Sequence, residues 1–176
     1  MPHFRDATIE DTDRLLEIYA PYVNGSATSF ETAVPNKEEF ASRITTYVSE
    51  WSWLVVEIDG EIAGYAYGGS HRARAAYRWS VETSAYIDSR FQGRGLAKAL
   101  YAQLFSRLAD RGYCNALAII VLPNPASVRL HESAGFERIG VVKRAGWKFG
   151  AWHDVAWYQR ALRDAPPSNE LSQTEA

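Results

Sequence analysis

Apolar residues recur along this chain at two spacings, and the two spacings predict different elements. Leu15, Ile18 and Tyr19 fall three or four residues apart, as on one face of a helix. The segment from Thr8 to Asp11 resembles a helix start, because a capping residue is followed three positions later by an acid. Helices are expected over residues 8–25, 38–48, 96–109 and 126–134.

Between the helical segments lie runs rich in β-branched and aromatic residues, which predict strands. Asp59-Gly60 separates two such runs and is a strong signal for a hairpin. Residues 113–122 are almost unbroken apolar sequence, which suits a strand buried on both faces. Strands are expected over residues 4–7, 53–58, 62–67, 79–87, 113–122, 136–148 and 152–162. This order of strands and helices describes an α+β protein with a mixed sheet.

Length, composition and charge favour one domain with a small partner. The chain has 176 residues, of which 47% are apolar, enough for one core. We expect a single domain over residues 1–164, and a disordered tail over residues 165–176, which contain two prolines and mostly polar residues. The net charge is −2, with both signs interspersed, so neither nucleic acid nor an anionic membrane is an expected partner.

Other features of the composition bear on location and assembly. The sequence has neither a secretory leader pattern nor a run of eighteen apolar residues, so no membrane span is expected. Cys114 is the single cysteine, which suits a core position in a protein of the reducing cytoplasm. Six tryptophans and ten tyrosines indicate aromatic walls around a pocket or at a subunit interface, and we expect a homodimer.

The turn at residues 92–97, Gln-Gly-Arg-Gly-Leu-Ala, leads into the helix predicted over residues 96–109. Its two glycines allow consecutive N–H groups to point into one concavity, and the helix dipole adds positive potential there. A diphosphate would fit such a concavity. The spacing differs from the dinucleotide and P-loop patterns, which disfavours hydride transfer and nucleotide hydrolysis. Taken alone, the turn could equally be a simple strand-to-helix connection.

Two titratable residues, one before and one after this turn in the sequence, are candidates for proton transfer. Glu82 interrupts a strand-forming run, and a carboxylate in a sheet costs several kcal/mol unless compensated. His131 lies on the short fourth helix and can take or give a proton at neutral pH. The sequence leaves open whether His131 is an acid, a base or a packing residue. Since position 135 is Gly135, His131-Glu132 is not the start of a zinc motif, and no metal is expected.

A basic segment at residues 70–77 precedes the strand that carries Glu82. Arg72 and Arg74 present two guanidinium groups, which suit a substrate with a carboxylate or a similar oxyanion. The alternative is a solvated basic loop without a ligand.

Two motifs resemble those of the GCN5-related N-acetyltransferase (GNAT) superfamily. Residues 92–97 are similar to its Gln/Arg-x-x-Gly-x-Gly/Ala signature, and residues 123–136 to its Asn-x-x-Ser/Ala…Gly-Phe motif. His131 stands where most members carry tyrosine. With the basic loop and residues 28–32 and 146–155, the chain resembles the phosphinothricin and methionine sulfoximine N-acetyltransferase branch over nearly all of residues 3–162.

The resemblance implies the acyl-CoA N-acyltransferase fold, a twisted, mostly antiparallel sheet with helices on both faces. In that fold the strands at residues 84–87 and 116–122 would run parallel and splay apart to admit the pantetheine arm. It also implies direct transfer from acetyl-CoA, in a ternary complex, to the α-amine of a small amino-acid analogue such as phosphinothricin or methionine sulfoximine.

The resemblance also implies roles for individual residues. The catalytic residues would be Glu82, as a base acting through water, and His131. The cofactor-binding residues would be Ala85, Tyr86, Ile87, Gly93, Arg94, Gly95, Leu96, Ala97, Lys98 and Asn124. The substrate-binding residues would be Phe30, Arg72, Ala73, Arg74, Glu82, Thr83 and Ser84.

Three alternatives remain open at this point. The same fold could acetylate a peptide N-terminus or another small amine, bind CoA as a sensor without turnover, or serve as an interaction domain. Trp152, His153 and Asp154 could line the site from a second subunit or only pack in a dimer. The acceptor amine depends on side-chain rotamers, which a sequence does not give.

Overall fold

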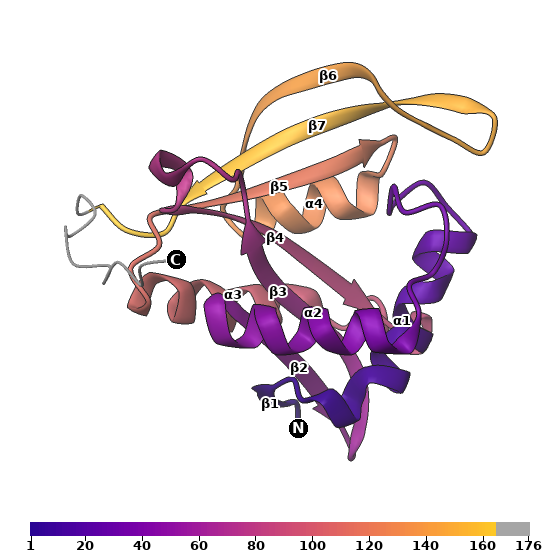
Figure 1. The fold of residues 1–176 in the computed structure, drawn as a ribbon, viewed down its shortest axis with the longest axis vertical. Coiled ribbons are helices and arrows are strands. Elements are labelled where there is room, and N and C mark those ends of the chain that lie inside the picture. Colours follow the sequence, from indigo (N-terminus) through magenta and orange to yellow (C-terminus); the bar gives the residue numbers. More distant parts are fainter. Residues whose placement is uncertain (165–176) are drawn as a thin grey trace.

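A seven-stranded mixed sheet runs through the molecule in the order β1-β2-β3-β4-β5-β7-β6 (Figure 1). The computed structural model describes residues 1–164, so the expected tail over 165–176 lies outside the described residues. Strands β4 and β5 are parallel, and the other neighbours are antiparallel, which confirms the predicted sheet. The strands are β1 (His3–Asp6), β2 (Ser52–Ile58), β3 (Glu61–Ser70), β4 (Ser80–Ile87), β5 (Asn115–Leu122), β6 (Glu137–Lys148) and β7 (Ala151–Ala161).

Four α-helices cover the two faces of the sheet, as predicted. They are α1 (Thr12–Asn24), α2 (Lys37–Glu50), α3 (Leu96–Asp110) and α4 (Pro125–Ser133), and three 3₁₀ turns lie at Ile9–Asp11, Ala75–Tyr77 and Ser89–Phe91. In Figure 1, α1 and α2 lie on the near face. Their apolar sides form one buried cluster, and α3 and α4 form a second cluster on the other side of the sheet. None of the helices in residues 1–164 is long and apolar enough to span a bilayer.

Local sequence signals account for several of these boundaries. The Thr8 backbone N–H donates to Asp11 Oδ2 at 2.8 Å, as in the capping box that the sequence predicted at these residues. Asn36 Oδ1 accepts the Glu39 N–H at 2.8 Å and caps α2. Asp59 and Gly60 have φ of 51° and 83°, the left-handed pair that a two-residue hairpin turn requires.

The side chains of β4 alternate between the two helical layers. Thr83 pairs with Gly68, and a Cβ added at Gly68 would meet Leu108 of α3. Glu82 pairs with Gly69, and a Cβ added at Gly69 would meet Tyr47 of α2. The Glu82 side chain therefore lies on the face of α1 and α2, and the Thr83 side chain on the face of α3 and α4.

Lys148 joins the end of β6 to the loop that follows α1. Its side chain is 5% exposed, and its ammonium donates to the backbone oxygens of Val23, Ser26 and Ser29 at 2.6, 3.1 and 2.7 Å. Burial lowers the pKa of Lys148, and the charge of Glu31 opposes this shift. The three bonds fix the loop that carries Phe30 against the β6–β7 hairpin.

Candidate functional site

Strands β4 and β5 part halfway along their length. Their parallel register covers three pairs and ends where Glu82 faces Leu117. Just beyond, the Thr83 hydroxyl donates to the Leu117 carbonyl oxygen at 3.2 Å, so a side chain replaces the next ladder bond. The expected splayed pair is therefore present, and residues 84–87 border an open gap.

A cavity of about 700 Å³ lies along this gap, a volume typical of small-molecule sites. Strand β4 contributes Ala85 and Ile87, and the α1 side contributes Tyr22 and Thr28. The remaining wall comes from residues 91–98 and from α4. This part of the lining is Phe91, Gln92, Gly93, Gly95, Leu96, Ala97, Lys98, Asn124, Ala126, Ser127, Arg129, Leu130 and Ser133.

The glycine turn lines part of this cavity. Gly93 and Gly95 have φ of 75° and 76°, and Gly95 is the N-cap of α3. The first helical hydrogen bond runs from the Ala99 N–H to the Gly95 oxygen at 3.1 Å. The preceding N–H groups, including those of Leu96 and Ala97, have no acceptor within the helix and can bind an anion.

The basic residues around the turn differ in position. Lys98 and Arg129 line the cavity. The Arg94 guanidinium lies over the Phe91 ring at 5.1 Å and donates to the Arg90 carbonyl oxygen. The structure therefore places the Arg94 side chain outside the cavity lining, although the sequence pattern assigned it to the cofactor.

Asn124 caps α4 and lines the same cavity. Its Oδ1 accepts the Ser127 N–H at 3.0 Å, so the oxygen is engaged within the helix start. The side-chain nitrogen is then the group that can donate to a ligand.

The backbone of β4 offers fewer groups to a ligand than the sequence suggested. The Tyr22 hydroxyl donates to the Ile87 oxygen at 2.6 Å and accepts the Ile87 N–H at 3.3 Å. The Asp88 N–H donates to Ala63 of the β3 segment, so by alternation Tyr86 also faces β3 and Ala85 faces the gap. Of the three predicted residues, Ala85 is the one whose backbone groups can pair with an extended ligand.

Glu82 forms a hydrogen-bonded pair with His71, which the sequence had not assigned to the site. His71 Nδ1 lies 2.9 Å from Glu82 Oε1. The side chains are 9% exposed for His71 and 36% exposed for Glu82. His71 follows β3, and nothing in the local sequence indicated that it would reach a carboxylate eleven positions later.

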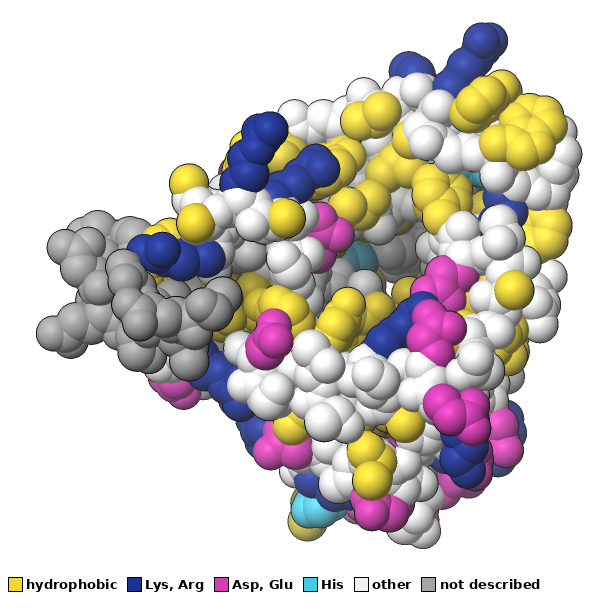
Figure 2. Space-filling model, viewed as in Figure 1, with side chains coloured by type: hydrophobic (Ala, Val, Ile, Leu, Met, Phe, Trp, Pro, Cys, Tyr) yellow, Lys and Arg dark blue, Asp and Glu magenta, His cyan; other side chains and the backbone are white. Residues whose placement is uncertain are grey.

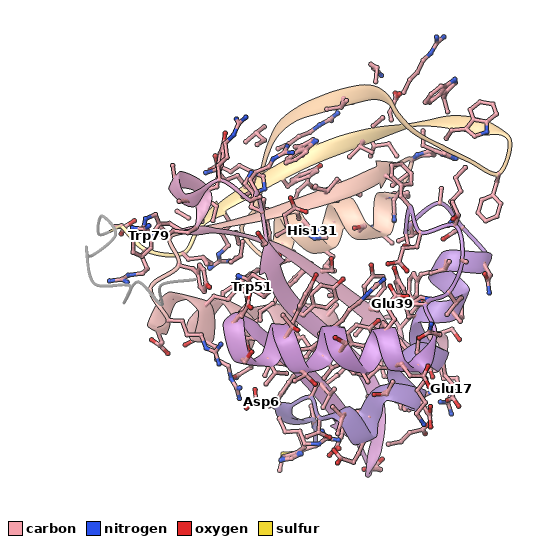
Figure 3. All side chains as sticks on the ribbon, in the orientation of Figure 1. Asp6, Glu17, Glu39, Trp51, Trp79 and His131 are labelled. Carbon is pink, nitrogen blue, oxygen red and sulfur yellow. The ribbon has the colours of Figure 1, made fainter. Side chains whose placement is uncertain are left out.

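His131 lies on the opposite side of the sheet, where α4 passes behind the splayed strands (Figure 3). It is 6% exposed, and burial lowers its pKa, which favours the neutral imidazole. Nδ1 lies 2.7 Å from the Ser127 carbonyl oxygen and must donate to it. Nε2 therefore accepts from the Tyr101 hydroxyl at 3.0 Å, and burial raises the Tyr101 pKa so that this hydroxyl stays protonated.

The predicted substrate-binding residues are divided between surfaces. Arg72 lies 5.7 Å above the Trp157 ring, and Arg72, Ala73 and Arg74 are exposed. Ser84 shares the face of Glu82, whereas the Thr83 side chain is buried on the other face. The structure brings Arg72 and Glu82 to the same region through His71 and Trp157, whose rings are in contact.

Phe30 lies against the β6–β7 hairpin. Its ring packs on Gly146, where a Cβ would lie 2.4 Å from Phe30 Cε2, and its centroid is 6.2 Å from that of His153. Figure 2 shows a hollow in this face of the molecule, between the β6–β7 hairpin and the α1–α2 side, with charged side chains of both signs at its rim. Among residues 1–164, no group of three potential metal ligands is found.

The arrangement places hydrogen-bonded pairs of titratable side chains on both faces of the sheet. Glu82 and His71 lie on the face of α1 and α2, and His131 and Tyr101 lie on the face of α3 and α4. A linear ligand anchored by the glycine turn could present its reactive end between the two pairs, which suits acyl transfer with a base on one side and an acid on the other.

Comparison with known proteins gives a consistent result. The model of the acetyltransferase (GNAT) domain family matches residues 4–157. The phosphinothricin N-acetyltransferase of Streptomyces viridochromogenes is 38% identical over 164 residues, which are 93% of this chain and 90% of that protein. The L-methionine sulfoximine/L-methionine sulfone acetyltransferase of Pseudomonas aeruginosa is 35% identical, covering 92% and 97%.

Solved structures show the same fold. The crystal structure of a phosphinothricin acetyltransferase from Sinorhizobium meliloti, in complex with acetyl-CoA, superposes with a TM-score of 0.92 at 33% sequence identity. The alignment covers 98% of this chain and 96% of that one.

Proposed function

The chain belongs to the acetyltransferase (GNAT) family, and we propose that it transfers the acetyl group of acetyl-CoA to the α-amine of a small anionic amino-acid analogue. One observation carries this proposal: the cavity that the glycine turn lines borders β4 just beyond Glu82, the residue at which the pairing of β4 with β5 ends, and includes Ser127 of α4, the helix that carries His131. The relatives named for phosphinothricin and methionine sulfoximine support the same acceptor class.

The residues of the cavity fit acetyl-CoA. The positive-φ glycines and the N-terminus of α3 suit a pyrophosphate, with Lys98 adding charge. The backbone of Ala85 and the side-chain nitrogen of Asn124 suit the amides of a pantetheine arm. When bound, acetyl-CoA supplies the activated acetyl thioester.

Residues of the chain then accept and donate the protons of the reaction. The acceptor ammonium must lose a proton before it can attack, and Glu82 takes this proton through water. When the carbon–sulfur bond breaks, the acylated nitrogen loses its second proton and the leaving thiolate gains one to become the CoA thiol. On the other face, the Tyr101 hydroxyl, hydrogen-bonded to His131 Nε2, is the group that passes this proton to the sulfur. No residue of the chain needs to carry the acetyl group.

The acceptor is held by charge and shape. Arg72 and Arg74 are the cations nearest in sequence to the Glu82 pair, and they suit a carboxylate together with a phosphinate or sulfoximine oxygen. Phe30 provides an apolar wall on the opposite side. Small anionic amines are therefore favoured over peptide N-termini.

We further propose that the enzyme is a cytoplasmic homodimer without nucleic-acid or membrane partners. The support is the exposure of large apolar side chains on the β6–β7 hairpin, which a monomer would leave in water. These residues are Ile139, Val142, Trp147, Phe149 and Trp152. Light scattering on the purified protein measures the mass, and a monomer at micromolar concentration would contradict this assembly.

Thiol release from acetyl-CoA tests the function. We expect turnover with phosphinothricin or methionine sulfoximine, and a loss of about 100-fold or more in kcat/KM for Glu82→Gln. Glu38→Gln, an exposed residue on α2, is the matched control. Turnover with peptides alone would contradict the acceptor class, and binding of acetyl-CoA without thiol release on any amine would indicate a sensor.

A further inference from the structure

The pair formed by His71 and Glu82 contains a residue that the proposed reaction has not used. His71 Nδ1 lies 2.9 Å from Glu82 Oε1. His71 directly follows Ser70, which pairs with Val81, so the two strands deliver both side chains to the same end of the gap. The imidazole is nearly buried, whereas the carboxylate is partly exposed.

The surroundings of His71 hold its ring in one orientation. The Tyr77 ring meets it edge-on, with centroids 5.6 Å apart and planes at 82°. The Trp157 ring meets it with centroids 6.0 Å apart and planes at 78°. A ring fixed by two aromatic neighbours gives the carboxylate a hydrogen-bond partner whose position does not change.

We propose that His71 is a positioning residue for Glu82. Its Nδ1–H donates to Glu82 Oε1, which restricts the rotation of the carboxylate and leaves Oε2 as the oxygen that takes the proton. This inference rests on the proposed function, in which Glu82 is the base. It follows the general arrangement in which a catalytic base is oriented by a third group.

Packing alone would not require a nitrogen at this position, and two substitutions separate the two roles. His71→Phe keeps an aromatic ring between Tyr77 and Trp157 but removes the donor. His71→Asn removes the ring but keeps an amide N–H at the place of Nδ1. If the hydrogen bond is what matters, His71→Asn keeps activity and His71→Phe loses it. If packing is what matters, His71→Phe keeps activity and His71→Asn loses it.

The first measurement is steady-state kinetics of the full-length protein with acetyl-CoA and phosphinothricin. We expect His71→Phe to lower kcat by about 10- to 100-fold, the effect of losing a hydrogen bond to a charged group. We expect His71→Asn to stay within about threefold of wild type, and the KM for acetyl-CoA to stay unchanged in both variants. Higher activity for His71→Phe than for His71→Asn would overturn the proposal.

A double-mutant cycle tests whether His71 acts through Glu82. In a Glu82→Gln background, His71→Phe should cause no further loss, because the carboxylate it positions is absent. Losses that multiply would show that His71 acts independently of Glu82, and would overturn the proposal.

A second readout does not depend on turnover. In the ¹⁵N spectrum of labelled histidines, assigned with His71→Phe, we expect the His71 tautomer protonated at Nδ1, with a changed Nδ1 shift in Glu82→Gln. A His71 protonated at Nε2 alone would overturn this inference while turnover remained intact. Absence of turnover by the wild type with every amine would instead overturn the proposed function, and with it the catalytic part of this inference.

Discussion

Replacing Lys148 by methionine would remove a buried positive charge and leave its hydrocarbon stem in place. The ammonium is held by three backbone oxygens that belong to residues 119 to 125 positions earlier in the chain. Methionine has a similar volume and fills the same channel, so the change is mainly the loss of these bonds.

The expected loss of stability follows from the acceptors left behind. The bonds to Val23 and Ser29 are buried, and the bond to Ser26 is partly exposed to water. Each buried acceptor without a partner costs about 1–3 kcal/mol, and water can replace the third bond. The sum is about 2–6 kcal/mol, reduced by the desolvation that the ammonium no longer suffers, so we expect a loss of about 3 kcal/mol.

Urea unfolding followed by tryptophan fluorescence measures this quantity, and a thermal scan gives an independent value. A loss of about 3 kcal/mol lowers Tm by about 6–12 °C for a chain of this size. Lys143→Met is the matched control, because Lys143 is on the same strand and is 77% exposed in its pair with Asp154, so its loss should be below about 1 kcal/mol. Equal losses for the two variants would refute the reasoning.

Two further predictions concern the glycine turn and acid stability. Gly95→Ala places a side chain on a backbone with φ of 76°, and we expect urea titrations to show a loss of about 1–2 kcal/mol of unfolding free energy. Gly140→Ala is the control, because a Cβ there meets no other atom and the backbone φ is not positive, so its loss should be smaller. Equal losses for the two variants would contradict backbone strain at residue 95. Binding to Arg90 and Arg14 lowers the Asp88 pKa below its ordinary value, so its stabilisation is present above about pH 4 and is lost as the pH falls through the folded pKa. The difference in unfolding free energy between wild type and Asp88→Asn should therefore shrink between pH 7 and about pH 3, and a constant difference would be evidence against this ion pair.

Hydrophobic spacing was sufficient to predict the strands and helices, because each element has its own periodicity. The boundaries depend on partners that spacing does not reveal. Strand β3 extends to Ser70 rather than Tyr67, since Gly68 and Gly69 pair with Thr83 and Glu82 of β4. Helix α1 begins at Thr12 rather than at residue 8, because residues Ile9–Asp11 form a separate 3₁₀ turn, and it ends at Asn24, close to the predicted end.

Some residues of the candidate site could be predicted from short motifs, and others could not. The glycine turn, Asn124 and Glu82 carry signals within short motifs, and they were predicted. His71, Tyr22 and Tyr101 were not, because their roles depend on partners that only the fold brings near. Tyr22 and Ile87 are 65 positions apart, and Tyr101 and His131 are 30 apart. The assignment of Glu82 and His131 to catalysis stays a prediction that kinetics must test.

The alternation of side chains along β4 bears on how such an enzyme could acquire a new acceptor. Glu82 and Ser84 face one helical layer, and Thr83 and Ala85 face the other. In the proposed reaction the acceptor lies on the side of Glu82, so substitutions at positions 82 and 84 would reshape the acceptor side while Thr83 and Ala85 stay unchanged on the other face. Selection for a different amine and retention of acetyl-CoA are then separable at single residues, and a one-residue slip of the strand would exchange the two surfaces.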